Sequence, residues 1–307
     1  MKVLIVAHTK DGKFSPFVQE QALALSEVGC SVGYFGIEGH SVMGYLKNLS
    51  SLKRKISDFK PDIVHAHYGL SGLLATMQRK VPVVVTFHNG ETLRWWVNYL
   101  SSLCAFRSKY VIYVAEHIRQ LSYYKARKYS IIPCGVDLED CSITDFESAR
   151  KLLNFEDGKK YVLFGGAFDN LRKNYPLLRE AVELMDDRDC VVCLEMKGLS
   201  RAECVLRMCA CDVFALPSKS EGSPQALKEA MACNCPIVAT DIADIRHLLG
   251  DMDGHFICNF DPKDLAEKIK AAFDFGDRTA GRERLVDLGL TNDAVARKLL
   301  DIYKMVI

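Results

Sequence analysis

Short runs of hydrophobic residues alternate along the chain with longer segments in which hydrophobic residues recur at helical spacing. In the first half these runs occupy residues 2–7, 31–36, 62–67, 81–87 and 110–115, and in the second half residues 161–166, 190–195, 212–216, 236–240 and 255–258. Continuous apolar runs of this length are typical of strands buried on both faces of a parallel sheet. In the segment 17–29 between two of them, Val18, Ala22, Leu25 and Val28 recur at helical spacing. We therefore expect an α/β fold of two doubly wound parallel sheets covered by helices.

A stretch with proline and glycine separates the two series of strands. Residues 131–137 read IIPCGVD, and polar sequence follows to about residue 158. Proline and glycine interrupt regular structure, so we place an N-terminal domain at about 1–140 and a C-terminal domain at about 155–290. The segment 292–307 is predicted to be an amphipathic helix that packs back on the first domain. Its apolar stripe consists of Val295, Leu299, Ile302 and Val306.

Composition and charge are those of a soluble globular enzyme. Of the 307 residues 49% are hydrophobic and 26% are charged, and the net charge of +1 gives the whole molecule no attraction to nucleic acid. The apolar N-terminal run meets His8 and Lys10 too early for a signal peptide, and no apolar stretch reaches the roughly 18 residues that cross a bilayer. We expect a cytoplasmic protein.

The twelve cysteines are scattered, as in a protein whose thiols stay reduced. Cys190 and Cys193 form a C-x-x-C, but no second such pair or histidine stands at zinc spacing, which leaves a zinc site as the minor alternative. A dehydrogenase is disfavoured too, because the first strand runs into AHTKDG at 7–12 rather than a G-x-G-x-x-G motif.

The segment 212–231, DVFALPSKSEGSPQALKEAM, carries the strongest chemical signal. A strand ends near Pro217, and Ser223 followed by Pro224 is typical of an N-cap and a first helical residue. The start of this helix would lie at the carboxyl end of a strand, where ligands of parallel α/β sheets bind. Unpaired N–H groups there favour a phosphate or a sugar hydroxyl.

Two carboxylates flank the start of this helix. Glu221 lies in the loop and Glu229 lies two turns into the helix, with seven residues between them. A carboxylate can accept two hydrogen bonds from vicinal hydroxyls, so the pair could hold two rings of one ligand. The alternative is that Glu221 caps a turn and Glu229 is a solvated helix residue. The apolar residues that follow, Ala230 and Met231, argue against a wholly solvated Glu229.

This segment resembles the E-x7-E signature of the family 4 retaining glycosyltransferases of the GT-B fold, written PS..EG.P...EAMA...P. The pattern continues in CNCPIVATD at 233–241, and HAHYGLSG at 65–72, VVTFH at 84–88 and IPCGVD at 132–137 resemble other segments of that family. The resemblance covers most of the chain. It implies two Rossmann-like domains that face a central cleft, the first binding the acceptor and the second binding a nucleotide-sugar donor.

The resemblance also implies roles for individual residues. Glu229 would accept hydrogen bonds from the donor ribose, and Glu221 would face the transferred sugar. Lys173 would neutralise the departing diphosphate, whose charge grows as the glycosidic bond breaks. His88 would reach the donor sugar from the first domain. The sugar and diphosphate would lie near Gly222, Ser223, Pro224 and Gln225. No metal and no other cofactor is expected.

The sequence departs from the family pattern at two places. The family has an arginine shortly before the lysine, whereas Gly166-Ala167 stands here. Two alternatives follow: Arg172 supplies the missing charge, or diphosphate binding is weaker. The segment 194–212 is shorter than in the family by about one βα unit, so the resemblance implies no particular nucleotide base.

Each of these residues also has a structural interpretation. Lys173 and Arg172 could be a solvated helix start, and His88 could be a core histidine, although its place after a strand favours function. We interpret His65, inside the strand 62–67, as structural. His67 ends that strand and is a candidate on the acceptor side.

The segment 92–130 combines basic and aromatic residues. It holds seven Lys or Arg and one acid, Glu116, together with Trp95, Trp96 and several tyrosines. Such a mixture suits an anionic membrane surface that carries a lipid-linked acceptor. An aromatic core helix followed by a basic loop is the alternative.

We therefore predict a retaining enzyme that transfers a hexose-type sugar from a nucleoside-diphosphate sugar to a hydroxyl of a glycan or lipid-linked acceptor. The expected context is surface polysaccharide or glycolipid biosynthesis, in the cytoplasm or at the inner face of the membrane. Two alternatives stay open: a nucleotide-sugar epimerase of the same fold, and a non-catalytic nucleotide-sugar-binding protein.

Overall fold

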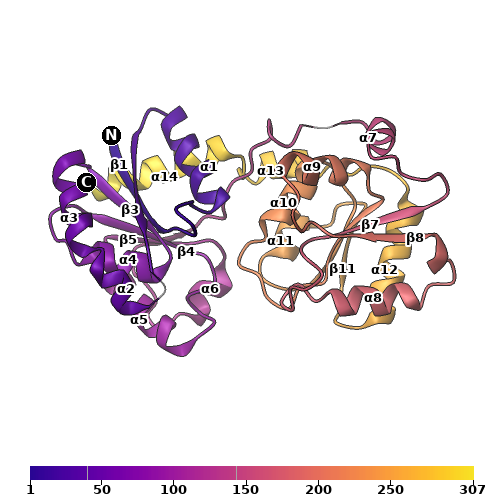
Figure 1. Ribbon diagram of the computed structural model, residues 1–307, viewed down its shortest axis with the longest axis horizontal. Coiled ribbons are helices and arrows are strands. Elements are labelled where there is room, and N and C mark those ends of the chain that lie inside the picture. The colour runs from indigo at the N-terminus through magenta and orange to yellow at the C-terminus, as the bar shows by residue number, and fades with distance from the viewer. Residues whose placement is uncertain (40, 143) are drawn as a thin grey trace. The chain divides into compact units, whose positions relative to one another are not determined.

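A computed structural model describes residues 1–39, 41–142 and 144–307 of the chain. It divides into two compact units (Figure 1). Unit 1 comprises Met1–Gly135 and Leu290–Ile307, and unit 2 comprises Val136–Gly289. Each unit contains one parallel sheet with helices on both faces, which confirms the predicted fold class.

The sheet of unit 1 has six strands in the order β2-β1-β3-β4-β5-β6. Their bounds are β1 Lys2–His8, β2 Ser31–Ile37, β3 Ile63–His67, β4 Val83–Phe87, β5 Tyr110–Tyr113 and β6 Tyr129–Ile131. The helices are α1 Pro16–Glu27, α2 Val42–Lys47, α3 Leu49–Phe59, α4 Gly69–Thr76, α5 Trp95–Arg107, α6 Glu116–Leu121 and α14 Asn292–Val306. The pattern did not predict β6, a three-residue edge strand with no fully buried residue.

Two hydrophobic clusters lie on the two faces of this sheet, because alternate residues of each strand point to opposite sides. One cluster joins Leu4 and Val6 of β1 to residues of α3 and α4. The other joins Val3 and Ile5 of the same strand to α1 and α14. In α14 the predicted stripe residues Val295, Leu299 and Ile302 are buried. Helix α14 therefore completes the core of unit 1 from a distant part of the sequence.

The sheet of unit 2 has five strands in the order β11-β10-β9-β7-β8. Their bounds are β7 Lys160–Phe164, β8 Val191–Leu194, β9 Val213–Leu216, β10 Ile237–Thr240 and β11 His255–Cys258. The α-helices are α7 Phe146–Leu152, α8 Tyr175–Glu183, α9 Arg201–Ala210, α10 Gln225–Ala232, α11 Ile245–Leu249, α12 Pro262–Phe275 and α13 Gly281–Asp287. Helix α7 lies in the stretch that the sequence left between the two domains.

The strand order decides which loops meet. Because β7 pairs directly with β9, the loops that follow these strands emerge side by side at the carboxyl edge of the unit 2 sheet. In unit 1, β3 pairs with β4 in the same way, so the loops after His67 and Phe87 are neighbours. These two pairs of loops carry most of the residues singled out in the sequence.

Candidate functional site

Two loops of unit 2 are held together by hydrogen bonds. The backbone N–H of Lys219, after β9, donates to the carbonyl of Arg172, after β7, at 2.9 Å. The Asn174 side-chain amide donates to the carbonyl of Pro217 at 3.2 Å. These bonds fix the segment around Arg172 and Lys173 beside the loop that contains Glu221.

Two cations converge on the buried carboxylate of Glu221. Lys173 Nζ lies 2.8 Å from Oε1, and Arg172 Nη1 lies 2.9 Å from Oε2. Arg172 also donates to the carbonyl of Ser220 at 2.7 Å. A Cβ at Gly166 would lie 2.8 Å from Cγ of Lys173, so glycine leaves room for that side chain to pass along the backbone. The loop sequence thus builds a cluster of two positive charges and one negative charge.

The charge state of Glu221 follows from its surroundings. Burial alone raises the pKa of a carboxyl group, but Lys173 and Arg172 outweigh burial and hold the pKa of Glu221 below its ordinary value. Glu221 is therefore ionised at neutral pH, and the cluster keeps a net charge of +1. Lys173 is therefore not a solvated residue, since its side chain is 13% exposed, whereas Arg172 stays 43% exposed.

The helix after this loop begins one residue later than predicted. Pro224 is the N-cap and α10 starts at Gln225, so Ser223 is not the cap. Pro224 has an extended ψ of 115°, which places it outside the helix. The hydroxyl oxygen of Ser223 is shielded from solvent and has no hydrogen-bond partner among the residues that the structure describes. A buried hydroxyl without a partner is a reason to look for a ligand there.

Glu229 lies on α10 with its side chain 14% exposed, and its Oε1 lies 3.4 Å from Nη2 of Arg201. Arg201 is the first residue of α9, whose N-terminus is closed by a capping box between Ser200 and Glu203. Glu229 is therefore not a solvated helix residue. The sequence did not single out Arg201, because the S-x-x-E capping signal at 200–203 marks a helix start and does not reveal a long-range partner.

His88 of unit 1 lies in a cluster of rings. Its Nε2 lies 3.1 Å from Nδ1 of His67, and its ring centroid lies 4.8 Å from those of Phe17 and Tyr68. His88 Nδ1 lies 3.9 Å from Sγ of Cys134. Both ring nitrogens of His88 thus have neighbours inside unit 1. Its predicted contact with a donor sugar stays a prediction.

The histidines of β3 are buried and uncharged, because burial lowers the pKa of both imidazoles. His65 lies between the Tyr303 hydroxyl, 2.5 Å from Nδ1, and the Thr86 hydroxyl, 2.7 Å from Nε2, which confirms its structural role. For His67 the pKa falls to about 3. The remaining ring nitrogen of His67, Nε2, is shielded and has no hydrogen-bond partner in the described part of the chain.

Glu91 is a further residue of this region, and the sequence reasoning missed it. Its side chain is buried and accepts three backbone N–H groups, from Gly69 at 3.1 Å and from His88 and Asn89 at 3.0 Å each. Two non-glycine residues beside these amides, Tyr68 and Asn89, have φ values of 69° and 104°. The carboxylate therefore holds the strained loops after β3 and β4 in place. The only local sequence signal for Glu91 was its position three residues after His88.

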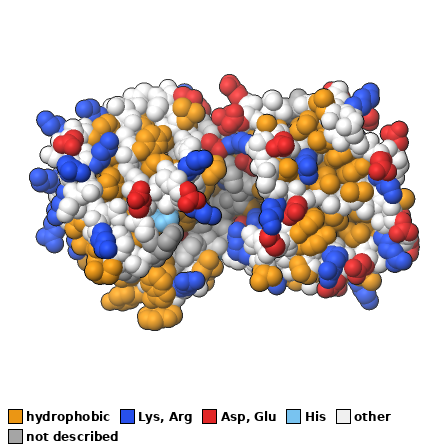
Figure 2. All heavy atoms as spheres, viewed as in Figure 1, with side chains coloured by type: hydrophobic (Ala, Val, Ile, Leu, Met, Phe, Trp, Pro, Cys, Tyr) orange, Lys and Arg blue, Asp and Glu red, His pale blue; other side chains and the backbone are white. Residues whose placement is uncertain are grey.

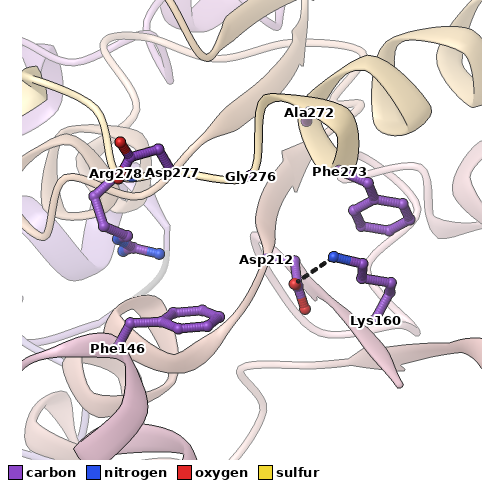
Figure 3. Close-up of a pocket in the computed structure, with 8 residues that line it drawn as sticks. All are labelled: Phe146, Lys160, Asp212, Ala272, Phe273, Gly276, Asp277 and Arg278. Carbon is purple, nitrogen blue, oxygen red and sulfur yellow. Dashed lines mark hydrogen bonds and ion pairs between the residues drawn. The ribbon is translucent and has the colours of Figure 1, made fainter. Parts of the chain in front are cut away.

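A small cavity of about 180 Å³ lies at the opposite edge of the unit 2 sheet (Figure 3). Lys160, at the start of β7, pairs there with Asp212 at 3.3 Å. Phe146 and Arg278 lie on the other side. The Arg278 guanidinium donates to three backbone carbonyls. These charges are satisfied within unit 2, and this edge carries none of the predicted site residues.

All twelve cysteines are free thiols. Cys190 directly precedes β8 and Cys193 lies within it. The described residues hold no group of three or more His, Cys, Asp or Glu side chains arranged for a metal ion. No helix of the described chain is long and apolar enough to cross a membrane.

Two family models match the chain. Residues 2–140 match the model described as Glycosyltransferase Family 4, and residues 200–274 match the model described as Glycosyl transferases group 1. The second match includes Glu221, Gly222, Ser223, Pro224, Gln225 and Glu229, and the first includes His88.

Curated relatives are similar over most of the chain. A D-inositol 3-phosphate glycosyltransferase of Geodermatophilus obscurus is 27% identical over 68% of this chain and 59% of its own length. An N,N'-diacetylbacillosaminyl-diphospho-undecaprenol alpha-1,3-N-acetylgalactosaminyltransferase of Campylobacter jejuni is 25% identical over 86% of this chain and 83% of its own length. The chain spans about three fifths of the length of several of these relatives.

The fold is shared with solved structures of low sequence identity. HepE of Anabaena, in complex with UDP, superposes with a TM-score of 0.78 at 14% identity and covers 99% of this chain and all of its own. The similarity shows the architecture of two parallel-sheet units.

Proposed function

The chain belongs to the family 4 type of glycosyltransferases with the GT-B fold, and from this premise we propose that it transfers a sugar from a nucleoside-diphosphate sugar to an acceptor hydroxyl. The relatives that act on inositol phosphate or on an undecaprenol-linked sugar support synthesis of a glycolipid or a surface polysaccharide. Retention of the anomeric configuration, a hexose-type donor sugar and independence of metal are parts of this proposal.

One observation carries the proposal: Lys173 and Arg172 converge on Glu221 beside the start of α10. The net charge of +1 attracts an anion, and the first N–H groups of a helix add further donors. A diphosphate bound there would share the two cations with Glu221. As the bond to the sugar breaks, charge accumulates on the diphosphate, and a fixed ammonium group stabilises it.

Glu229 would hold the ribose of the same donor. Its Oε1 lies 3.4 Å from Nη2 of Arg201, and this contact orients the carboxylate. An ionised carboxylate is an acceptor for the two hydroxyls of a ribose. In unit 1, His88 would contact the donor sugar and His67 would lie on the acceptor side, because imidazole nitrogens are suited to hydrogen bonds with sugar hydroxyls.

Calorimetry with UDP, GDP and ADP tests the donor site directly. We expect one of these nucleotides to bind wild-type protein, and Lys173→Ala to weaken that binding. Absence of binding by all three, at concentrations up to the millimolar range, would contradict the proposal.

Product analysis tests the reaction. Nuclear magnetic resonance of the product should show the same anomeric configuration as the donor. Isomerised sugar formed from donor alone would instead identify an epimerase. Donor binding without turnover across a panel of inositol phosphate and polyprenyl-diphosphate-sugar acceptors would indicate a binding protein.

A further inference from the structure

Helix α5 carries three of its four aromatic side chains on the outside and small side chains on the inside. Trp95, Tyr99 and Phe106 are 74%, 65% and 68% exposed. They lie with Leu103 along one stripe of the helix, at positions i, i+4, i+8 and i+11. The buried face instead presents Asn98, Ser101, Ser102, Cys104 and Ala105. Core packing of unit 1 therefore does not explain the aromatic stripe.

The loop after α6 extends the same surface. The Asn98 side-chain amide donates to the carbonyl of Leu121 at 2.8 Å, and the N–H of Tyr123 donates to Asn98 Oδ1 at 3.0 Å. These bonds fix the loop against α5 while Leu121 and Tyr123 stay 57% and 64% exposed. We call the resulting surface the α5 patch. It consists of Trp95, Tyr99, Leu103, Phe106, Leu121 and Tyr123.

The charged residues of the segment 92–130, which contains α5 and the loop after α6, are almost all basic. Arg94 and Arg107 lie at the two ends of α5, and Lys125 and Arg127 follow Tyr123 closely; all four are exposed. The only acid in the segment 92–130, Glu116, pairs with Arg119 at 3.1 Å. Figure 2 shows hydrophobic side chains gathered at the end of unit 1 where Figure 1 places α5, with Lys and Arg side chains beside them.

We propose that the α5 patch docks unit 1 on a lipid bilayer that contains anionic headgroups. Tryptophan and tyrosine are enriched at the boundary between headgroups and acyl chains, because their rings are apolar and their N–H and O–H groups are polar. Arginine and lysine around them reach the anionic headgroups. A protein partner would have to be acidic where it meets Arg94, Arg107, Lys125 and Arg127, and the aromatic stripe projects from the helix rather than lining a groove.

Docking through the α5 patch would place the loop of His88 close to a lipid-linked acceptor, an inference that rests on the proposed function. Helix α5 starts directly after the loop of His88 and Glu91, and Glu91 ties that loop to the start of α4. Docking through α5 would hold the carboxyl edge of β3 and β4 near the headgroups. The sugar of a lipid-linked acceptor would lie at that depth.

Both tryptophans of the chain, Trp95 and Trp96, lie at the start of α5, so intrinsic fluorescence reports on the patch without a label. We expect a blue shift and co-sedimentation with vesicles of phosphatidylglycerol and phosphatidylcholine at about 50 mM salt. Phosphatidylcholine vesicles, or about 0.5 M salt, should reduce binding at least roughly tenfold because the basic residues then contribute little. No binding to anionic vesicles at low salt overturns the proposal.

Two variants locate the binding. The double variant Trp95→Ser/Phe106→Ser should lose at least roughly tenfold in vesicle binding, and Arg94→Gln/Lys125→Gln/Arg127→Gln should lose about fivefold per residue. The matched control is Phe260→Ser in unit 2, where the phenylalanine is 54% exposed and lies outside the patch. Equal loss in Phe260→Ser overturns the proposal.

Two further measurements distinguish lipid docking from self-association and from the donor site. Analytical ultracentrifugation without lipid would reveal a dimer that Trp95→Ser/Phe106→Ser dissociates, and this result with no vesicle binding would assign the patch to a second copy of the chain and overturn the proposal. Nucleotide binding by calorimetry should be unchanged in all of these variants. Vesicle binding without any nucleotide binding would contradict the proposed function and leave the α5 patch supported.

Discussion

The two units each bury a glutamate in a loop at the carboxyl edge of their sheet, and they hold it in different ways. In unit 2, Glu221 is paired with Lys173 and Arg172 at 2.8 and 2.9 Å. In unit 1, Glu91 accepts three backbone N–H groups instead. Burial raises the pKa of Glu91 to about 7, against the lowering effect of these amides, whereas the two cations keep the pKa of Glu221 below its ordinary value.

The difference distinguishes a binding site from a support. Side-chain cations are mobile and leave a net charge of +1, so an anionic ligand can share them with Glu221. Backbone amides cannot be shared without moving the loop, so Glu91 fixes the chain conformation around His88. We therefore expect changes at Glu221 and its partners to alter catalysis, and changes at Glu91 to alter stability first.

The largest effect is expected from Lys173→Ala. Loss of the ammonium group should lower kcat about a hundredfold to a thousandfold, because the departing diphosphate loses a preorganised positive partner. Steady-state transfer assays measure this, and a thermal melt checks that the protein stays folded. Lys197→Ala is the matched control, since Lys197 pairs with Asp169 and is 57% exposed. Near-normal activity of Lys173→Ala would contradict the role of the cluster.

Glu229→Ala is expected to raise KM for the donor about tenfold to a hundredfold, the range for a lost hydrogen bond to a charged group. Titration of the matching nucleotide by calorimetry should show the same loss of affinity. Glu180→Ala, an exposed acid on α8, serves as the control. If Glu229→Ala weakened transfer but left nucleotide affinity unchanged, Glu229 would not be binding the ribose.

Glu91→Ala is expected to lower the free energy of unfolding by about 2 to 4 kcal/mol, because several buried amides lose their acceptor. Glu91→Gln keeps one acceptor oxygen and should lose less. Chemical denaturation of wild type, Glu91→Ala and Glu91→Gln measures the order of their free energies of unfolding. If Glu91→Ala were as stable as wild type, the carboxylate would not be holding these loops.

The pH dependence of stability tests the raised pKa of Glu91. A carboxyl group whose pKa is about 7 in the folded state and about 4.5 in the unfolded state binds its proton more tightly when folded. Its contribution to stability is therefore complete below a pH of about 4.5 and is lost as the pH rises to about 7. Wild type should become less stable relative to Glu91→Gln between pH values of about 4.5 and 7, measured by denaturation at each pH. If the difference in stability between wild type and Glu91→Gln did not change with pH, the pKa of Glu91 would be near its ordinary value.

The smallest effect is expected from Tyr303→Phe, about 1 kcal/mol in the free energy of unfolding, because His65 loses one hydrogen-bond partner. Transfer activity should remain within about twofold of wild type, since the pair lies in the core of unit 1. A large loss of activity at unchanged stability would mean that His65 takes part in the reaction.

The strands could be predicted well because their signal is local. The run predicted at residues 236–240 is mostly apolar and flanked by turn residues, and the structure places β10 at Ile237–Thr240. Strand β6 was missed because it is three residues long, lies at the sheet edge and is only partly buried, so its pattern does not differ from that of a loop. The helix start at α10 was displaced by one residue because Ser-Pro suits an N-cap, while the Pro224 backbone stays extended.

The site was partly predictable for the same reason. The E-x7-E spacing is a local signal, whereas Lys173 was singled out only by the resemblance to the family. Strand order then brings these residues together. The pairs Arg201 with Glu229 and Glu91 with the amides of Gly69 and His88 depend on segments distant in sequence or on backbone conformation. Residue types alone do not specify such contacts.

Helix α14 has a consequence for the order in which the protein forms. Unit 2 is one continuous segment, whereas the core of unit 1 needs α1 and α14, which lie far apart in the sequence. During synthesis, unit 2 can fold before α14 has been made, and until then His65 lacks its hydrogen bond with the hydroxyl of Tyr303. Unit 1 would then be the last part to reach its native form, and a ribosome stalled shortly before α14 would leave an exposed apolar sheet face for chaperones to cover.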